Sequence, residues 1–449
     1  MKRTSPYRWL ALWAGLLLLA PGCKQPAPET HIDDQPAPTF ERPRVPDWAK
    51  NAVIYEVNLR QYTPEGTIAA FRHHLPRLRD LGVDILWFMP IHPISQTKRK
   101  GTLGSYYAVA DYKAVNPEHG TLEEFKALVQ EIHDLGMKVI LDWVPNHTGW
   151  DHPWISQHPD WYTQDENGNI LDPVNPETGE SWGWTDVADL NYDVPEMRLA
   201  MIEAMKFWVT ECDVDGFRCD VAHGVPADFW VQATDSLYAL EPLFMLAEAE
   251  VPELRNNGSF VMDYGWSFHH LMNEIARGEK NALDIERWLQ EDRKKYTQGY
   301  HMHFTSNHDE NSWAGTEFER LGEGHKAFAV LAATFDGMPL IYSGQEAAFN
   351  RRLAFFEKDS IDWGDFPYTD FYRTLFELKH RNQALWNGKD GGELQRIPTG
   401  ADDKVFAFLR EKNGDRLVVV INLSPDTQTI TLQGSAYTGE YTNVFARGT

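Results

Sequence analysis

Short apolar runs recur along the middle of this chain, and segments with helical spacing separate them. The eight runs cover residues 52–59, 85–89, 138–141, 216–219, 243–247, 260–262, 301–305 and 338–342. Strands made of apolar residues throughout are buried on both faces, which is typical of parallel strands joined by crossover helices. Helical patterns at residues 122–135 and 195–208 supply such crossovers. Eight units of this kind predict a closed (β/α)₈ TIM barrel, a fold of the α/β class.

The same patterning divides the chain into parts. A polar stretch punctuated by proline and glycine, residues 148–192, predicts a loop-domain insertion after the third strand of a barrel that covers residues 47–390. We expect at least half of its five tryptophans to form a small core. Apolar runs at 404–411 and 416–423 flank Asn413-Gly414-Asp415, a strong hairpin signal. They predict a small C-terminal antiparallel β domain at residues 391–449, with a further strand at 439–445.

The N-terminal segment has the pattern of an export signal. Residues 1–22 carry Lys2, Arg3 and Arg8 before an apolar run that is too short to span a bilayer. The run ends just before Cys23 and resembles a bacterial lipoprotein signal, with Cys23 as the acylated residue and ordinary cleavage nearby as the alternative. Residues 23–46 are rich in proline and poor in large apolar residues, which predicts a flexible tether. We therefore expect an exported cell-envelope lipoprotein, periplasmic or at the surface, or otherwise a secreted protein.

Composition narrows the classes of partner. The 449 residues include 66 acidic and 42 basic side chains, for a net charge of −24 with histidine neutral. A chain this acidic is repelled by phosphate backbones, so nucleic-acid binding is disfavoured, and we expect membrane contact only through the lipid anchor. Seventeen tryptophans fit a surface that stacks on flat apolar faces such as sugar rings. Cys212 and Cys219 lack a metal-binding or redox spacing and are expected to be buried free thiols. The sequence makes no prediction of oligomeric state.

Polar residues follow several of the predicted strands at the point where each strand ends. They are Asp142 and His147 after the third strand, Arg218 and Asp220 at the fourth, Glu248 after the fifth, and His308 and Asp309 after the seventh. The carboxyl ends of the strands of such a barrel meet at one rim, where the chemistry of these folds takes place. Charged groups are costly to bury, so the cluster indicates function, with a structural ion-pair network around Arg218 as the alternative.

From about residue 46 onward the chain resembles the α-amylase family of retaining glycoside hydrolases. The matching motifs are DWVPNH (142–147), GFRCDVAH (216–223), LAE (246–248), FTSNHD (304–309) and GMPLIYSGQE (337–346), together with GVDILWFMP (82–90) and ADLN (188–191). Each motif is weak alone, but their order and spacing are highly specific. The resemblance implies cleavage of α-1,4-glucosidic bonds in starch-type glucans or maltooligosaccharides, without an organic cofactor. Transglycosylation or isomerisation and a non-catalytic glycan-binding subunit are the alternatives.

By this resemblance, Asp220 is the nucleophile that forms a covalent glycosyl-enzyme, and Glu248 is the general acid and then the general base. Asp309 is implied to hold the distorted sugar. Retention requires the two reacting carboxyl groups to lie only about 5–5.5 Å apart, one ionised and one protonated. We expect Arg218, on the same strand face as Asp220, to keep the nucleophile ionised, while the negative Asp220 raises the pKa of Glu248.

The resemblance also implies substrate-binding roles. His147 and His308 match the histidines that hydrogen-bond the sugar at the scissile bond, with buried structural histidines as the alternative. Tyr107 matches the ring stacked under that sugar, although core packing is possible and the adjacent Tyr106 leaves the register open. Glu250 shares the strand face of Glu248, but Glu248 is preferred as the acid because it directly ends the apolar run.

A structural calcium ion is a further implication of the resemblance. The family's ion commonly ties the barrel to the loop domain through positions that match Asn146 and Asp189, together with backbone carbonyls. Oxygen ligands of this kind suit Ca²⁺. The family's frequent Lys-His pair after the nucleophile is absent here, and Gly224 could supply a carbonyl at the fourth position. A plain hydrogen-bonding role for Asn146 is the alternative.

Overall fold

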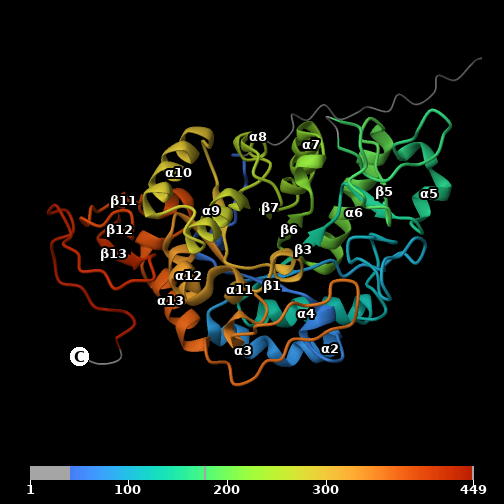
Figure 1. Cartoon of the computed structure of the whole chain (residues 1–449). Helices are drawn as coiled ribbons and strands as arrows, with labels where there is room; N and C mark the ends of the chain where they lie inside the picture. The colour runs from blue at the N-terminus through green and yellow to red at the C-terminus, as the bar shows by residue number, and fades with distance from the viewer. Residues whose placement is uncertain (1–40, 176–177, 447–449) are drawn as a thin grey trace, which may run out of the picture. The chain divides into compact units, whose positions relative to one another are not determined.

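The computed structural model describes residues 41–175 and 178–446. Its centre is a closed barrel of parallel strands in the order β1-β10-β9-β8-β7-β6-β3-β2 (Figure 1), which confirms the predicted fold. All eight predicted runs form barrel strands, within a few residues of the expected bounds. These strands are β1 (Ile54–Val57), β2 (Ile85–Phe88), β3 (Lys138–Trp143), β6 (Gly216–Cys219), β7 (Phe244–Ala247), β8 (Met262–Tyr264), β9 (Tyr300–His303) and β10 (Gly337–Tyr342).

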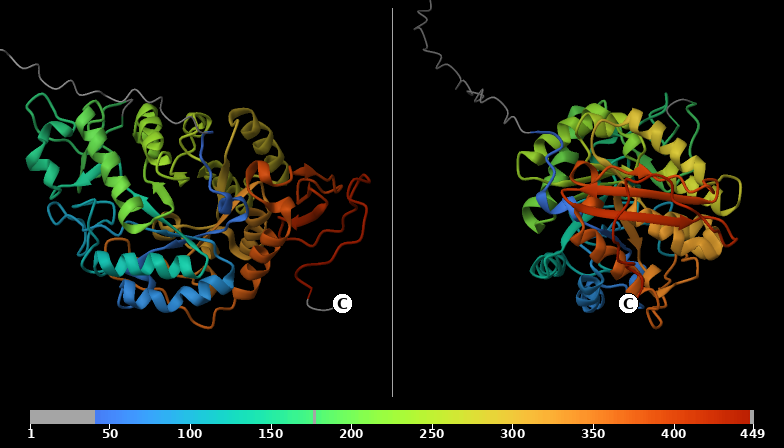
Figure 2. Two further views of the ribbon diagram at one scale, coloured as in Figure 1. Left: turned by 180° about the vertical axis from the view of Figure 1, so that it is seen from behind. Right: turned by 90° about the vertical axis from the view of Figure 1, so that its left-hand side faces the viewer.

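Helices lie outside the strands and provide the crossovers (Figures 1 and 2). The longer ones are α3 (Leu75–Leu81), α4 (Leu122–Asp134), α6 (Pro195–Cys212), α7 (Ala227–Tyr238), α9 (Trp266–Ala276), α10 (Ala282–Lys295), α12 (His325–Thr334) and α13 (Thr369–Arg381). Short helices are α1 (Leu59–Tyr62), α2 (Ile68–Phe71), α5 (Pro153–Gln157), α8 (Pro252–Asn256) and α11 (Glu317–Leu321). Helix α4 shows why they form: Thr121 and Glu124 make a capping box, and Phe125, Leu128 and Ile132 bury one face.

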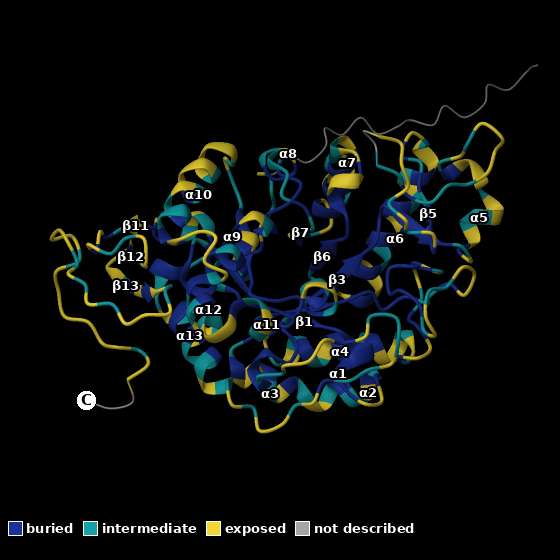
Figure 3. Cartoon of the chain, viewed as in Figure 1, coloured by how far each residue is buried: buried dark blue, intermediate teal, exposed yellow. Residues whose placement is uncertain are grey.

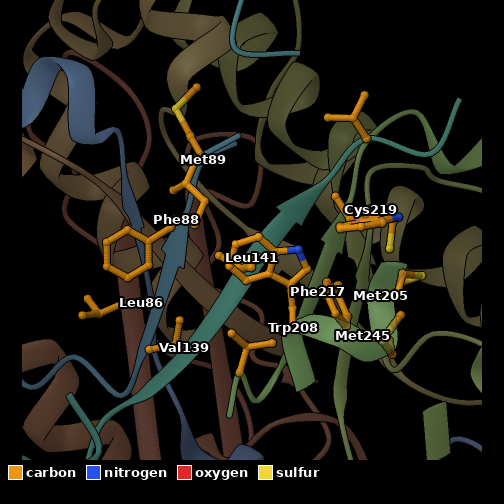
Figure 4. Packing of buried hydrophobic residues seen from close by; sticks show 14 of the residues in the cluster. Leu86, Phe88, Met89, Val139, Leu141, Met205, Trp208, Phe217, Cys219 and Met245 are labelled. Carbon is orange, nitrogen blue, oxygen red and sulfur yellow. The ribbon is translucent and has the colours of Figure 1, made fainter. Parts of the chain in front are cut away.

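Two apolar layers stabilise the barrel. Alternate strand residues point outward, so that Leu86 and Leu141 belong to the same apolar layer as Trp208 of helix α6, between the strands and the helices (Figure 4). The intervening residues, such as Trp87 and Ile140, fill the barrel interior. Figure 3 shows the result: the strands are buried and the outer faces of the helices are exposed. Cys212 and Cys219 are buried free thiols, as expected.

The insertion after β3 is built on a two-stranded antiparallel ladder of β4 (His147–Gly149) and β5 (Val187–Asp189). Trp161 is buried, and Trp150 and Trp154 pack against the same apolar cluster. The remaining two tryptophans, Trp182 and Trp184, line a cavity described below. Of the five tryptophans of the insertion, one is therefore buried in the core and two are half-buried against it.

The N-terminal predictions fall largely on residues that the structure does not describe. The export signal, Cys23 and the tether up to residue 40 lie outside the described residues. The last part of the predicted tether, residues 41–46, is not free. Arg42 pairs with Asp235 and donates to the Thr234 hydroxyl at 2.7 Å, and Arg44 donates to the Tyr238 carbonyl, so this segment is fastened to helix α7. Within the described residues, none of the helices has the length and apolar character needed to cross a membrane.

The C-terminal part contains an antiparallel sheet of β11 (Gln395–Arg396), β12 (Val405–Lys412) and β13 (Asp415–Asn422), as predicted. The strand predicted at 439–445 is wrong, because these residues are irregular and mostly exposed. Tyr441 and Phe445, which supply its apolar positions, are 45% and 46% exposed, so no face of the segment is buried as a strand requires.

The sheet is joined to the barrel by apolar packing and by one buried cation. Phe406 and Phe408 of β12 belong to the same buried cluster as Phe268 of helix α9 and Phe335, which directly follows helix α12. Arg410 is fully buried and donates to the carbonyls of Gly392, Thr334, Phe335 and Trp386 at 2.7–3.2 Å. Two of these carbonyls end helix α12, which Arg410 therefore caps.

We expect Arg410→Met to destabilise the protein strongly, because it leaves several buried carbonyls without a donor. The free energy of unfolding should fall by about 3 kcal/mol. Urea unfolding followed by tryptophan fluorescence measures the loss. Arg416→Met is the matched control, since its ion pair with Glu411 is surface-exposed and contributes only about 0–1 kcal/mol. A loss no larger than that of the control would contradict the capping role.

Candidate active site

The polar residues predicted from sequence meet at the carboxyl-terminal end of the barrel. Asp142 on β3 is the register partner of Arg218 on β6, and β6 pairs with β7 on its other side. The ladders continue one residue past the strands, because the Asp220 N–H donates to Trp143 and the Glu248 N–H donates to Cys219. Asp220 and Glu248 therefore leave the ends of adjacent strands side by side.

These residues surround a cavity of about 960 Å³. Among the predicted site residues, those that line it are Tyr107, His147, Asp220, Glu248, His308 and Asp309. Arg218 lies beneath them and is fully buried. The other lining residues include Lys100, Trp182, Trp184, His223, Glu250, Trp266, Trp313, Phe355 and Phe356. A concave site with several aromatic walls and a few converging polar groups is typical of a small-molecule site.

One guanidinium organises the floor of this cavity. Arg218 lies within 2.9 Å of Asp142 Oδ1 and of Asp220 Oδ1, and within 3.0 Å of Glu248 Oε1. Its Nε also donates to the Tyr264 hydroxyl at 3.1 Å. Three carboxyl groups thus share one buried cation. Burying so much charge is costly, which makes the arrangement hard to explain as packing alone.

The pKa values of the two central carboxyl groups run in the reverse order from the sequence expectation. Burial raises the pKa of Asp220 well above its usual value, Glu248 raises it further, and Arg218 only partly opposes this. Burial also acts to raise the pKa of Glu248, but Arg218 and the Val221 N–H outweigh it and lower that pKa. The expectation was wrong because it assigned Arg218 to Asp220 alone.

Val221 has a specific part in this difference. Its N–H donates to Glu248 Oε2 at 2.8 Å, a contact that favours the ionised carboxylate. The residue adopts a φ of 43°, which is unusual for a β-branched side chain and costs conformational energy. The strained backbone therefore aims an N–H at one member of the carboxyl pair and not at the other.

The two histidines of the site differ in charge. His308 Nδ1 lies 2.5 Å from Glu56 Oε1, and its Nε2 lies 2.8 Å from the Tyr107 hydroxyl and 3.3 Å from Asp309 Oδ2. Burial alone would lower the pKa of His308, but Asp309 and Glu56 outweigh it and raise that pKa to about 9. Burial lowers the pKa of His147 to about 4, so this ring is neutral.

The structure also separates the alternatives that the sequence left open. Tyr107 lines the cavity and its hydroxyl lies 3.2 Å from Asp142 Oδ2, whereas Tyr106 contacts Asn58. Glu250 lines the cavity too, but its oxygens accept hydrogen bonds from the backbone and hydroxyl of Ser267, away from Arg218.

Sequence reasoning missed Glu56, Trp313, Phe355 and Phe356. Glu56 lies inside the apolar run of β1 and is fully buried, and a single carboxylate in a strand-forming run was the only signal for it. The three aromatic residues lie in segments after β9 and β10 that carry no motif. Asp142 was noted at the rim, but its contact with Arg218 follows only from the strand register.

The residues predicted to bind calcium lie in neighbouring segments, since the Leu190 N–H donates to the Asn146 carbonyl. The Asp189 carboxylate accepts a hydrogen bond from the Thr163 hydroxyl at 2.7 Å, and burial raises its pKa to about 6. Asn146 Nδ2 lies 3.2 Å from His147 Nδ1. A bound cation would stabilise the ionised form of the Asp189 carboxylate. The side-chain oxygens of Asp189 and Asn146 are the kind of ligand that Ca²⁺ prefers, so their chemistry fits a calcium site.

In the described part of the chain, one group of three carboxylate or histidine ligands is close enough to hold a metal ion: Glu250, Asp292 and His301. Both ring nitrogens of His301 already face carboxylates, at 2.7 Å from Asp263 and 3.1 Å from Asp292. These carboxylates raise the pKa of His301 to about 9, although burial opposes them. Ion pairing with a charged histidine therefore accounts for Asp292 and His301, while Glu250 accepts hydrogen bonds from Ser267.

Two family models match the chain. Residues 51–276 match the alpha amylase catalytic domain, and residues 399–448 match the alpha amylase C-terminal all-beta domain. The first match covers the strands that carry Asp142, Arg218, Asp220 and Glu248.

Individual proteins are similar over most of the chain. An alpha-amylase from Haloarcula japonica is 27% identical over 86% of this chain, and an alpha-1,4-glucan:maltose-1-phosphate maltosyltransferase from Rhodospirillum rubrum is 29% identical over 85%. The chain spans only 57% and 58% of the lengths of these two relatives. A crystal structure of a noncanonic maltogenic alpha-amylase from Thermotoga neapolitana is 29% identical, with a TM-score of 0.79, covering 89% of this chain and 93% of that one.

We expect the His308 imidazole to titrate with a pKa of about 9. Glu56→Gln should lower this pKa, because it removes one of the two carboxylates that stabilise the protonated His308 ring. NMR titration of the ¹⁵N-labelled imidazole measures both values. Since the pKa in the folded protein exceeds the ordinary 6.5, the stabilisation from this charge is complete below about pH 6.5 and is lost as the pH rises through about 9. An unchanged His308 pKa in Glu56→Gln would contradict the pairing.

Proposed function

The chain belongs to the alpha-amylase family and is an enzyme of the glycoside hydrolase type, and from this we propose that it hydrolyses α-1,4-glucosidic bonds with retention of configuration. The substrates are starch-type glucans or maltooligosaccharides. The observation that carries the proposal is the set of contacts around Arg218, which holds Asp220 and Glu248 together at the floor of an open, aromatic-lined cavity.

In this proposal Asp220 attacks the anomeric carbon and Glu248 protonates the leaving oxygen, then activates the water that releases the product. Asp309 binds the retained sugar from the other side of the cavity. Two carboxyl groups held side by side, with one proton between them, are the requirement for a retaining reaction. Arg218 keeps the pair aligned, and it stabilises the carboxylates as charge moves between them.

Attack requires an ionised Asp220 and a protonated Glu248. Burial acts to raise the pKa of both carboxyl groups, and both contact the same guanidinium, so the pair can hold one proton between them. Positive charge that develops at the anomeric carbon stabilises the Asp220 carboxylate and drives the proton toward Glu248.

The remaining contacts support binding of the retained sugar. The charged His308 and the neutral His147 both line the cavity and can hydrogen-bond sugar hydroxyls. The Tyr107 hydroxyl is hydrogen-bonded to His308, and this contact holds the tyrosine ring in place as a surface for the sugar. Asn146 and Asp189 would hold a calcium ion between the insertion and the barrel, where the ion's role is structural.

Glycosyl transfer is the second candidate, because a maltosyltransferase is among the similar proteins. Both reactions share the covalent intermediate and differ in whether water or a sugar hydroxyl attacks it. The proposal also includes export and a lipid anchor at Cys23, which the N-terminal sequence pattern supports.

We expect the purified protein to release products from maltoheptaose in the α configuration first, observed by proton NMR of the new reducing ends. Products longer than maltoheptaose would identify transfer. Asp220→Asn should lower turnover by roughly 10⁴-fold, because no nucleophile remains, while maltoheptaose binding by calorimetry persists. Initial β product, or full turnover in Asp220→Asn, would overturn the assignment. Binding without turnover in the unaltered protein would favour a glycan-binding subunit.

Glu248→Gln should lose about 10²–10⁴-fold in kcat/KM on maltoheptaose, because the leaving oxygen is no longer protonated. The loss should be much smaller on α-maltosyl fluoride, whose leaving group needs no proton. Steady-state kinetics on both substrates measure the difference. Glu250→Gln is the matched control, since this carboxylate faces Ser267, and it should affect the two substrates equally. Equal losses in Glu248→Gln would remove the general-acid role.

A further inference from the structure

Trp313 is unusual in its exposure. It is 58% exposed, and it is the one tryptophan among the exposed large apolar residues of the described chain. It also lines the cavity that contains the carboxyl pair. Leaving so much apolar surface in water is unfavourable, and the described residues cover less than half of this side chain. An exposed aromatic ring at the edge of a binding cavity is a candidate contact for a ligand.

The Trp313 ring is held in place by two neighbouring rings. Its centroid lies 5.3 Å from Phe355 and 5.9 Å from Phe356, which are also cavity-lining residues. We call these three residues the aromatic platform. Phe355 in turn stacks on Tyr107 at 6.4 Å with an interplanar angle of 12°. The platform therefore continues the ring surface that begins beside His308.

The backbone of the platform is also fixed. Trp313 lies in a π-helical turn, Glu310–Ala314, directly after Asp309, and such turns are rare and frequent at functional sites. The Asn311 side chain joins this turn to the segment that carries Phe355. Its Nδ2 donates to the Arg351 carbonyl at 3.1 Å, and its Oδ1 accepts from the Leu353 N–H at 2.9 Å. The exposed ring thus belongs to a rigid assembly.

The barrel order places the platform on a defined side of the carboxyl pair. Its residues and Tyr107 follow β9, β10 and β2, which with β1 form one arc of the closed barrel. Glu248, Glu250 and Trp266 follow β7 and β8 on the other arc. In the proposed reaction, the group that leaves lies beside Glu248, so the platform lies toward the sugar chain that is retained.

We propose that the aromatic platform binds a glucosyl unit of the retained chain, beyond the unit held by Asp309, and thereby sets a preference for longer substrates. The apolar face of the sugar ring covers the exposed face of Trp313. This inference rests on the proposed function and deepens it, because it names a specificity determinant of the same cavity.

The test compares a long substrate with one that contains a single glucosyl unit. The probes are maltoheptaose, which reaches the platform, and α-glucosyl fluoride, which fills only the central position. In Trp313→Ala the ratio of kcat/KM for maltoheptaose to that for α-glucosyl fluoride should fall about tenfold, the factor that corresponds to about 1.4 kcal/mol. Trp313→Phe, which keeps a ring, should retain most of the ratio.

Controls separate the platform from general effects. Tyr441→Ala removes an exposed aromatic outside the cavity and should leave the ratio unchanged. Asn311→Ala keeps the Trp313 ring but breaks the link between the two segments, and it should lower the ratio in the same direction. An unchanged ratio in Trp313→Ala, with normal turnover, would overturn the platform while leaving the proposed function intact.

Binding gives a readout that is independent of turnover. Calorimetry of maltoheptaose with Asp220→Asn and with Asp220→Asn combined with Trp313→Ala should show about tenfold weaker binding in the double variant. If the unaltered protein bound maltoheptaose without cleaving it, the proposed hydrolase function would fail, and this comparison would still decide the platform. Equal affinities in the two variants would reject it.

Discussion

The buried guanidinium of Arg218 is the constraint on which the rest of the site depends. A single cation within 3.0 Å of three carboxyl groups brings together β3, β6 and the end of β7. Loss of the Arg218 cation would leave three carboxyl groups without their cationic partner. This would destabilise the folded protein far more than the loss of one exposed ion pair. The same contacts link stability to chemistry, because the guanidinium that makes the carboxyl groups tolerable in the interior also acts on the pKa of each of them.

The sequence predicted the features that repeat along the chain, and it missed those that depend on a single side-chain contact. The apolar runs identified all eight strands, and the motifs after them identified the carboxyl groups and histidines of the cavity, because the ends of the strands meet at one rim. The aromatic residues contributed by the segments after β9 and β10 carried no motif and were missed. The directions of the Asp220 and Glu248 pKa shifts were not predictable, since they depend on the contact of Arg218 with Glu248 as well as with Asp220, and on the Val221 N–H. Glu56 was missed because a buried acid inside β1 has no pattern of its own.

Two errors at the edges of the fold have a common cause. The last residues of the predicted tether are fastened to helix α7 by Arg42 and Arg44, although their composition is that of a linker. The strand predicted at 439–445 contains residues that favour strands, such as Tyr441 and Phe445, but no face of it is buried. In both places the sequence indicated only the local preference of the chain. Tertiary contacts hold residues 41–46 against helix α7, whereas residues 439–445 lack the packing that a strand requires.

The way the barrel closes has a consequence for how the protein reaches its active form. β1 pairs with β10, so that Ile54 lies opposite Leu340, and His308 reaches back 252 residues to Glu56. Contacts so distant along the chain carry a large loop-closure entropy and form late in folding. The Glu56 contact of His308 therefore forms only after β1 and the segment that follows β9 have met, so a nascent chain lacks this part of the site until almost the whole barrel has been synthesised.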